Sequence, residues 1–258
     1  MEQIQDVYDY FPGCVPAYCV FHMNLSGILE LLKVPYKEYD STVEELALIG
    51  VVAYTEAFFK DHFASVVNVF PERIALLKKG KRDVTVDLTD LLEIGPPLPS
   101  KFGFLLSERL DFGSPGEVNR IYHDLFPLTP FSKDEVAEFN QVIHCRNLLV
   151  HHGGIATLGY CKGIHRKSGD RAFQDSIRVT KEFVGRAAIL ANEVASKTVR
   201  ATISRLSDEC GADPSDIRKR AVDLMGDFLD QSEELKANYN KVCLVYLPES
   251  GDAGPVEQ

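Results

Sequence analysis

The chain has 258 residues, of which 45% are hydrophobic and 26% charged, a balance that can fill the core of a globular protein. Its formal net charge of −10 argues against broad, sequence-independent binding to phosphate backbones and against docking on anionic membranes. The charge still leaves room for a small local basic site.

The N-terminal segment lacks the basic start of a secretory signal peptide, because Glu2, Asp6 and Asp9 lie there. The most apolar stretch, residues 46–59, contains Glu56 and is too short to cross a bilayer. The six cysteines form no Cys-x-x-Cys pair, which predicts reduced thiols and a cytoplasmic protein.

Residues 1–36 are predicted to be an N-terminal extension with a short helix at 25–34. A long helix is predicted at 42–67, because Ser41 and Glu44 make a capping box before it. This helix is apolar on nearly all sides, which is typical of a central buried helix.

A loop-rich insertion is expected around residues 78–115, with some β-branched alternation in 82–100. The next helix is predicted to start near Ser114 or Pro115 and to be closed by Pro127.

Another capping box, Ser132 with Glu135, predicts a helix that runs to about residue 152. Gly153 and Gly154 then supply a left-handed stop.

Residues 157–176 are rich in turn formers, and a long helix is predicted at 177–207. A further helix follows, with Asp213 or Ser215 as its N-cap.

These elements predict a mainly α protein, a helical bundle with N-terminal and C-terminal helical additions. One domain is expected over residues 1–247, and residues 248–258 are expected to be a disordered tail.

The helix at 133–152 carries an unusual set of polar residues at its C-terminal end. At about 100° per residue, Arg146 lies in the middle of a broad apolar face. That face comprises Val136, Phe139, Val142, Ile143, Leu149 and Val150. A polar stripe runs along its flank and consists of Asn140, His144, Asn147 and His151.

Two interpretations of this helix stay open. It is either a core helix with a snorkelling arginine and capping histidines, or one wall of a catalytic cleft. A histidine can exchange a proton with a 2′-OH or a leaving oxygen, and an arginine can hold a phosphate. Asn147, one turn before His151, would orient it, while Arg146 and His151 lie about 140° apart around the helix. Two copies of the helix, facing each other across a dimer, would complete such a site.

The hexapeptide RNLLVH at 146–151 resembles the R-polar-x-x-x-H motif of the HEPN superfamily. The surrounding FPLTPFSKDEVAEFNQVIHCRNLLVHHGGI and the earlier YTEAFFKDHF are similar to HEPN proteins of bacterial defence and toxin systems. The resemblance covers residues 40–208 and implies a HEPN-like helical bundle that forms a homodimer.

This resemblance also implies a metal-independent endoribonuclease without a cofactor. Its motif residues map onto Arg146, Asn147 and His151, which cleave RNA through attack of the 2′-OH. The implied setting is antiviral defence or growth arrest, with a regulatory or antitoxin protein as a further partner. A HEPN-like module that serves dimerisation or interaction without catalysis is the alternative hypothesis.

Several residues are candidates for accessory roles. His152 offers a second histidine, His144 extends the polar stripe, and Glu56 is a candidate partner for Arg146. The basic segment after the motif is a candidate for binding the substrate phosphate, through Lys162, Arg166 and Lys167. No metal site is expected, because His144 and His151 are two helical turns apart, about 10 Å, and no HExxH motif occurs.

Overall fold

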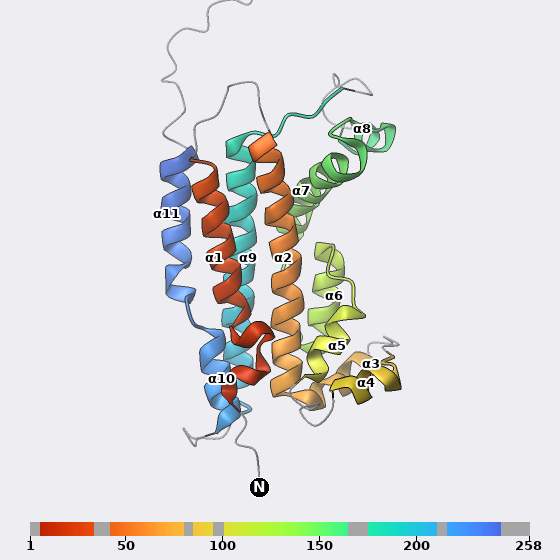
Figure 1. Ribbon diagram of the computed structural model, residues 1–258, viewed down its shortest axis with the longest axis vertical. Coiled ribbons are helices and arrows are strands. Elements are labelled where there is room, and N and C mark those ends of the chain that lie inside the picture. Colours follow the sequence, from red (N-terminus) through yellow and green to blue (C-terminus); the bar gives the residue numbers. More distant parts are fainter. Residues whose placement is uncertain are drawn as a thin grey trace, which may run out of the picture.

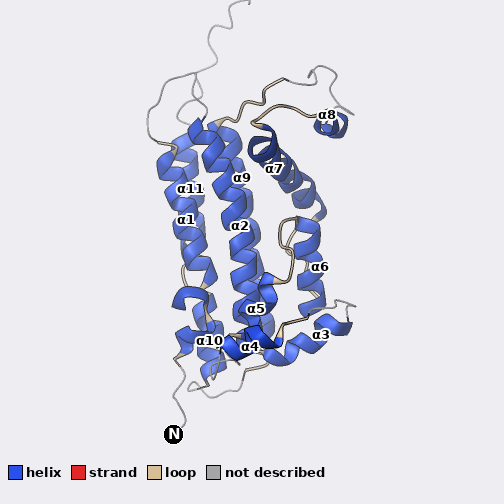
Figure 2. Cartoon of the chain, turned by 45° about the vertical axis from the view of Figure 1, so that its right-hand side comes forward, coloured by secondary structure: helices blue, strands red, loops and turns tan. Residues whose placement is uncertain are grey.

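The computed structural model describes residues 6–33, 42–79, 85–94, 101–164, 175–210 and 216–243. Within these ranges the regular structure is helical, apart from one isolated bridge between Ile155 and Ser176. The prediction of a mainly α helical bundle is therefore confirmed (Figure 1, Figure 2). In chain order the α-helices are α1 (Ala17–Leu31), α2 (Thr42–Val69), α3 (Ile74–Lys79), α4 (Leu88–Ile94), α5 (Phe102–Glu108), α6 (Pro115–Leu125), α7 (Lys133–His152), α8 (Leu158–Ile164), α9 (Lys181–Ser207), α10 (Ile217–Met225) and α11 (Ser232–Cys243).

Helices α1 and α2 pack side by side in opposite directions (Figure 1). Phe21, early in α1, lies 5.0 Å from Phe58, late in α2, between ring centroids. Ile28, near the end of α1, lies beside Gly50. Burial of aromatic and aliphatic side chains between the two helices supplies much of the hydrophobic stabilisation.

Helices α9 and α11 complete a four-helix bundle with α1 and α2. Asn192 of α9 donates to the Ser232 carbonyl at 3.2 Å, and Tyr239 of α11 donates to the Glu182 carbonyl at 3.3 Å. These two pairs fix α11 antiparallel to α9. Asn192 also accepts a 2.7 Å hydrogen bond from the Tyr18 hydroxyl, so the polar atoms buried here are paired.

The terminal helices are integral parts of the core. One hydrophobic cluster includes Val7 near the N-terminus and Tyr239 in α11. Helix α1 begins at Ala17, earlier than the predicted start at residue 25, and α11 had not been predicted. The observed N-cap of α10 is Asp216, so neither predicted cap is used.

Helices α5, α6 and α7 form a second layer against α2 (Figure 2). The expected loop-rich insertion contains α4 and α5, and its β-branched stretch forms no strand in the described part. Helix α5 approaches α2 so closely that a Cβ at Gly103 would collide with the Ala64 carbonyl. The Gly103 N–H donates to Asn68 at 2.7 Å. Ser114 caps α6 as predicted, accepting from the Glu117 N–H at 3.3 Å.

No helix in the described ranges is both long and apolar enough to traverse a bilayer. The predicted cap Ser41 and the expected tail at 248–258 lie outside the described residues.

Candidate functional site

Helix α7 has the caps that its sequence predicts. The Ser132 hydroxyl accepts from the Glu135 N–H at 3.3 Å, and the Glu135 carboxylate accepts from the Ser132 N–H at 2.6 Å. At the other end Gly153 has φ 56° and Gly154 has φ 78°, a left-handed conformation that glycine adopts at low cost. Both N–H groups donate to the Leu148 carbonyl, which fixes the end of the helix.

The apolar face of α7 differs from the prediction near its end. Phe139 and Val142 are buried as predicted, but Val150 is 49% exposed and Leu148 is buried instead. The cause is tertiary, because α8 and residues 175–177 return over other sides of the last turns. Cys145 lies 3.8 Å from the Tyr160 hydroxyl of α8.

The predicted polar stripe is accessible along its length. Asn140 and Asn147 are half-buried, and His144 and His151 are exposed. Its members share the flank of α7 that no other described element buries fully. The stripe therefore offers amide and imidazole groups to an external ligand.

Arg146, predicted to lie in the middle of the apolar face, is half-buried. The predicted pairing of Glu56 with Arg146 is wrong. Glu56 instead forms an ion pair with Lys60 at 3.0 Å, because the two residues are one turn apart on α2. Among the described residues, no carboxylate lies within ion-pair distance of Arg146.

His151 and His152 both lie exposed in the last turn of α7. A separation of five residues puts Arg146 and His151 about 7.5 Å apart along the axis and about 140° apart around it. The arginine and the histidine of one chain therefore leave α7 from different sides of the helix.

The predicted phosphate-binding segment is described only in part. Lys162 belongs to α8, a helix where a turn-rich segment was expected, and its side chain lies outside the description. Arg166 and Lys167 also lie outside the described residues. Their contribution to the site stays a prediction.

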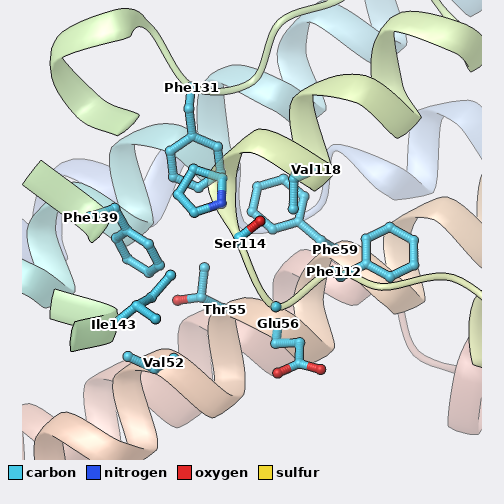
Figure 3. A pocket seen from close by; sticks show the side chains of 12 residues that line it. Val52, Thr55, Glu56, Phe59, Phe112, Ser114, Val118, Phe131, Phe139 and Ile143 are labelled. Atoms are coloured by element: carbon cyan, nitrogen blue, oxygen red, sulfur yellow. The ribbon is translucent and has the colours of Figure 1, made fainter. Parts of the chain in front are cut away.

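A small pocket, with room for little more than a water molecule, lies where α7 packs on α2 (Figure 3). Its walls are mainly apolar, with Phe139 and Ile143 supplied by α7. The Thr55 hydroxyl in it donates to a backbone carbonyl at 2.7 Å, and the Ser114 hydroxyl is the cap of α6. Glu56 lies at its edge, with its carboxylate turned away from the aromatic rings. The pocket contains no free nucleophile and does not include the motif residues.

Two neighbouring ionisable residues in α2 were not singled out from the sequence. His62 is fully buried, stacks between Phe58 and Tyr122, and contacts the Thr202 hydroxyl at 3.1 Å. Burial lowers the pKa of His62 to about 4 and raises the pKa of Asp61 to about 6. In the sequence, His62 is recognisable as a histidine within a mainly apolar helix. Because aromatic rings enclose its side chain, we interpret it as a core residue.

The described residues contain no group of three or more His, Cys, Asp or Glu side chains that would hold a metal ion. The chain matches no protein-family model, no curated protein and no solved structure.

Proposed function

We propose that this chain is a metal-independent endoribonuclease of HEPN type that acts as a homodimer. One observation on Arg146 carries the proposal. Its guanidinium has no ion-paired carboxylate among the described residues, and the exposed His151 follows five residues later on the same helix. A half-buried guanidinium in this state is suited to bind an external anion.

In the proposed reaction the 2′-OH of RNA attacks the adjacent phosphorus atom. His151 takes the proton of the 2′-OH or donates a proton to the departing 5′ oxygen. The new O2′–P bond replaces the broken P–O5′ bond, leaving a 2′,3′-cyclic phosphate and a 5′-hydroxyl. Arg146 stabilises the negative charge that builds up on the phosphate, and Asn147 orients His151.

The homodimer is part of the proposal, because the divergence of Arg146 and His151 within one chain calls for a second copy. In such a site, the arginine of one copy and the histidine of the other would act on one phosphate. The net charge of −10 favours the second candidate, a non-catalytic HEPN-like module for interaction or dimerisation.

The test is incubation of the purified protein with total RNA in EDTA. We expect cleavage by the natural protein and by the His152→Ala variant, and none by His151→Ala. The matched histidine variants remove the same imidazole from adjacent exposed positions, so a structural effect would be shared by both. If His152→Ala is inactive and His151→Ala is active, the assignment of the catalytic histidine is wrong. If the natural protein leaves RNA intact, the non-catalytic module is favoured.

A further inference from the structure

The polar stripe of α7 extends to the start of the helix. Ala137 and Lys133 continue its spacing toward the N-terminus, and both are exposed. The extended line is called here the α7 track, and it consists of Lys133, Ala137, Asn140, His144, Asn147 and His151. Its members follow one another at intervals of four and three residues, so they lie on one side of the helix. From Lys133 to His151 the track is about 27 Å long, at 1.5 Å per residue.

The α7 track carries no carboxylate, although the chain has 38 acidic residues and only 28 lysines and arginines. The acidic residues of α7 are Asp134, Glu135 and Glu138. Each of them lies about 100° or more around the helix from the line through Lys133 and His151. Glu135 is also ion-paired with Lys197 of α9. The side of α7 that bears the track therefore does not repel a phosphate backbone through its own residues.

The polar side chains of the track are unused within the protein. Among the described residues, the two asparagines and the two histidines of the track form no side-chain hydrogen bond, and Lys133 forms no ion pair. An amide both donates and accepts hydrogen bonds, and an imidazole can also stack on a base. The track thus presents free groups of the kind that recognise exposed bases.

The charge of the track favours a single strand over a duplex. Lys133 is its only residue with a fixed positive charge, and Arg146 adds one beside it. A duplex is bound mainly through its phosphates and its shape, which calls for several cations. In a single strand the bases are free to stack on imidazoles and to bond with amides. Contacts of this kind give affinity to a protein whose net charge of −10 gives it little attraction for phosphates.

We propose that the α7 track holds the RNA substrate as a single strand, with Asn140 and His144 in contact with its bases and Lys133 in contact with a phosphate. Asn140 lies about 16 Å from His151 along the helix axis, so it contacts a base away from the cleaved bond. Asn140 and His144 are then specificity-determining residues, because they touch the substrate without transferring a proton. This inference deepens the proposed function and rests on it for the identity of the ligand as RNA.

The test is binding of a single-stranded RNA oligonucleotide of mixed sequence whose 2′-hydroxyls are all methylated. Such a strand lacks the nucleophile of the proposed reaction, so binding is measured separately from cleavage. Fluorescence anisotropy at about pH 8, above the ordinary pKa of histidine, gives the dissociation constant. We expect the natural protein to bind the single strand at least about tenfold more tightly than a duplex of the same sequence.

Substitutions on and beside the track test the base contacts. Asn140→Ala and His144→Ala are each expected to weaken binding about tenfold, because each loses the contact with one base. Gln141→Ala is the matched control, since Gln141 is exposed on α7 about 100° around the helix from Asn140. It should bind like the natural protein. Circular dichroism checks that every variant is folded.

The salt dependence of binding separates the phosphate contact from the base contacts. The slope of log affinity against log salt concentration changes by about 0.7 for each phosphate that a protein neutralises on a single strand. Lys133→Ala should therefore reduce the slope by about 0.7, whereas Asn140→Ala should lower the affinity at an unchanged slope. Arg220→Ala removes an exposed positive charge from α10 and should leave the slope unchanged. A merely structural role of Lys133 would not move this slope.

The outcomes distinguish the track from the chemistry. A natural protein that does not bind the strand, equal binding of the duplex, or full binding by both Asn140→Ala and His144→Ala would overturn the track. Binding that depends on the track, with natural RNA left intact, would uphold the track and overturn the proposed ribonuclease. Cleavage of natural RNA that both variants leave unchanged would uphold the ribonuclease and overturn the track.

Discussion

The carboxylate of Glu56 is ion-paired with Lys60 at 3.0 Å and so does not neutralise Arg146. Exposed pairs of this type contribute little to folding stability. The Glu56–Lys60 ion pair on α2 is therefore separate from the motif residues on α7. We expect substitutions in the motif, and not in the ion pair, to affect RNA cleavage.

Replacing Arg146 by alanine is expected to lower kcat/KM for RNA at least about a hundredfold, because the positive charge next to the phosphate is lost. The free energy of unfolding should change little, since no described carboxylate pairs with Arg146. Glu56→Gln is the matched control and should cleave RNA at the natural rate. Equal loss in both variants would show that the Glu56 carboxylate serves the site after all.

Mixing two inactive variants tests whether the site is shared between chains. Arg146→Ala retains His151, and His151→Ala retains Arg146, so a mixed dimer contains one complete composite site. We expect the mixture to regain about a quarter of the natural activity, since half of the dimers are mixed and each has one intact site. Mixtures as inactive as the separate variants would place each site within a single chain.

Asp61→Asn is expected to stabilise the protein at neutral pH. Burial raises the folded-state pKa of Asp61 from 3.8 to about 6. Its stabilising contribution is therefore present below pH 3.8 and is lost as the pH rises to 6. With the partial exposure of Asp61 taken into account, we expect a gain of about 1 kcal/mol at pH 7.5 and none near pH 4. Urea unfolding at both pH values measures this, and a larger gain in acid would contradict the assignment.

His62 has the opposite effect on stability. Its folded-state pKa is lowered from 6.5 to about 4, because the stacked and buried ring resists protonation. Its contribution is present above pH 6.5 and is lost as the pH falls to 4, by about 3 kcal/mol in all. In the Asp61→Asn background, the free energy of unfolding should fall with decreasing pH without the opposing pH dependence that Asp61 contributes. Adding His62→Gln should remove the slope; a slope that persists would assign it to other groups.

The sequence predicted those parts of the fold that local chemistry determines. Ser114, the Ser132–Glu135 capping box and the glycines at 153–154 satisfy the free backbone groups at helix ends, so they mark those ends directly. The sequence of α2 is apolar on nearly all sides, which predicted its burial, and other helices cover it on several sides.

Features that depend on tertiary contacts were missed. Helix α11 is short and mostly polar, and becomes fixed through contacts such as that of Tyr239 with α9. The exposure of Val150 depends on where α8 packs against α7, and the periodicity of the α7 sequence does not predict that position. Within the site, helical spacing alone predicted the polar stripe on α7. It did not predict the partner of Glu56, because Lys60, one turn away on the same helix, and Arg146, on another helix, were both possible partners.

The most direct test of the central claim is cleavage of one RNA oligonucleotide in EDTA, beside the same strand with a single 2′-deoxy nucleotide at the cleaved position. The 2′-OH adjoins the phosphate that it attacks, so the proposed reaction needs it and needs no metal. We predict that the natural strand yields a 5′ fragment with a 2′,3′-cyclic phosphate and that the 2′-deoxy strand resists at that position. Cutting of the deoxy position, or activity that vanishes in EDTA and returns with Mg²⁺, would contradict the proposed chemistry.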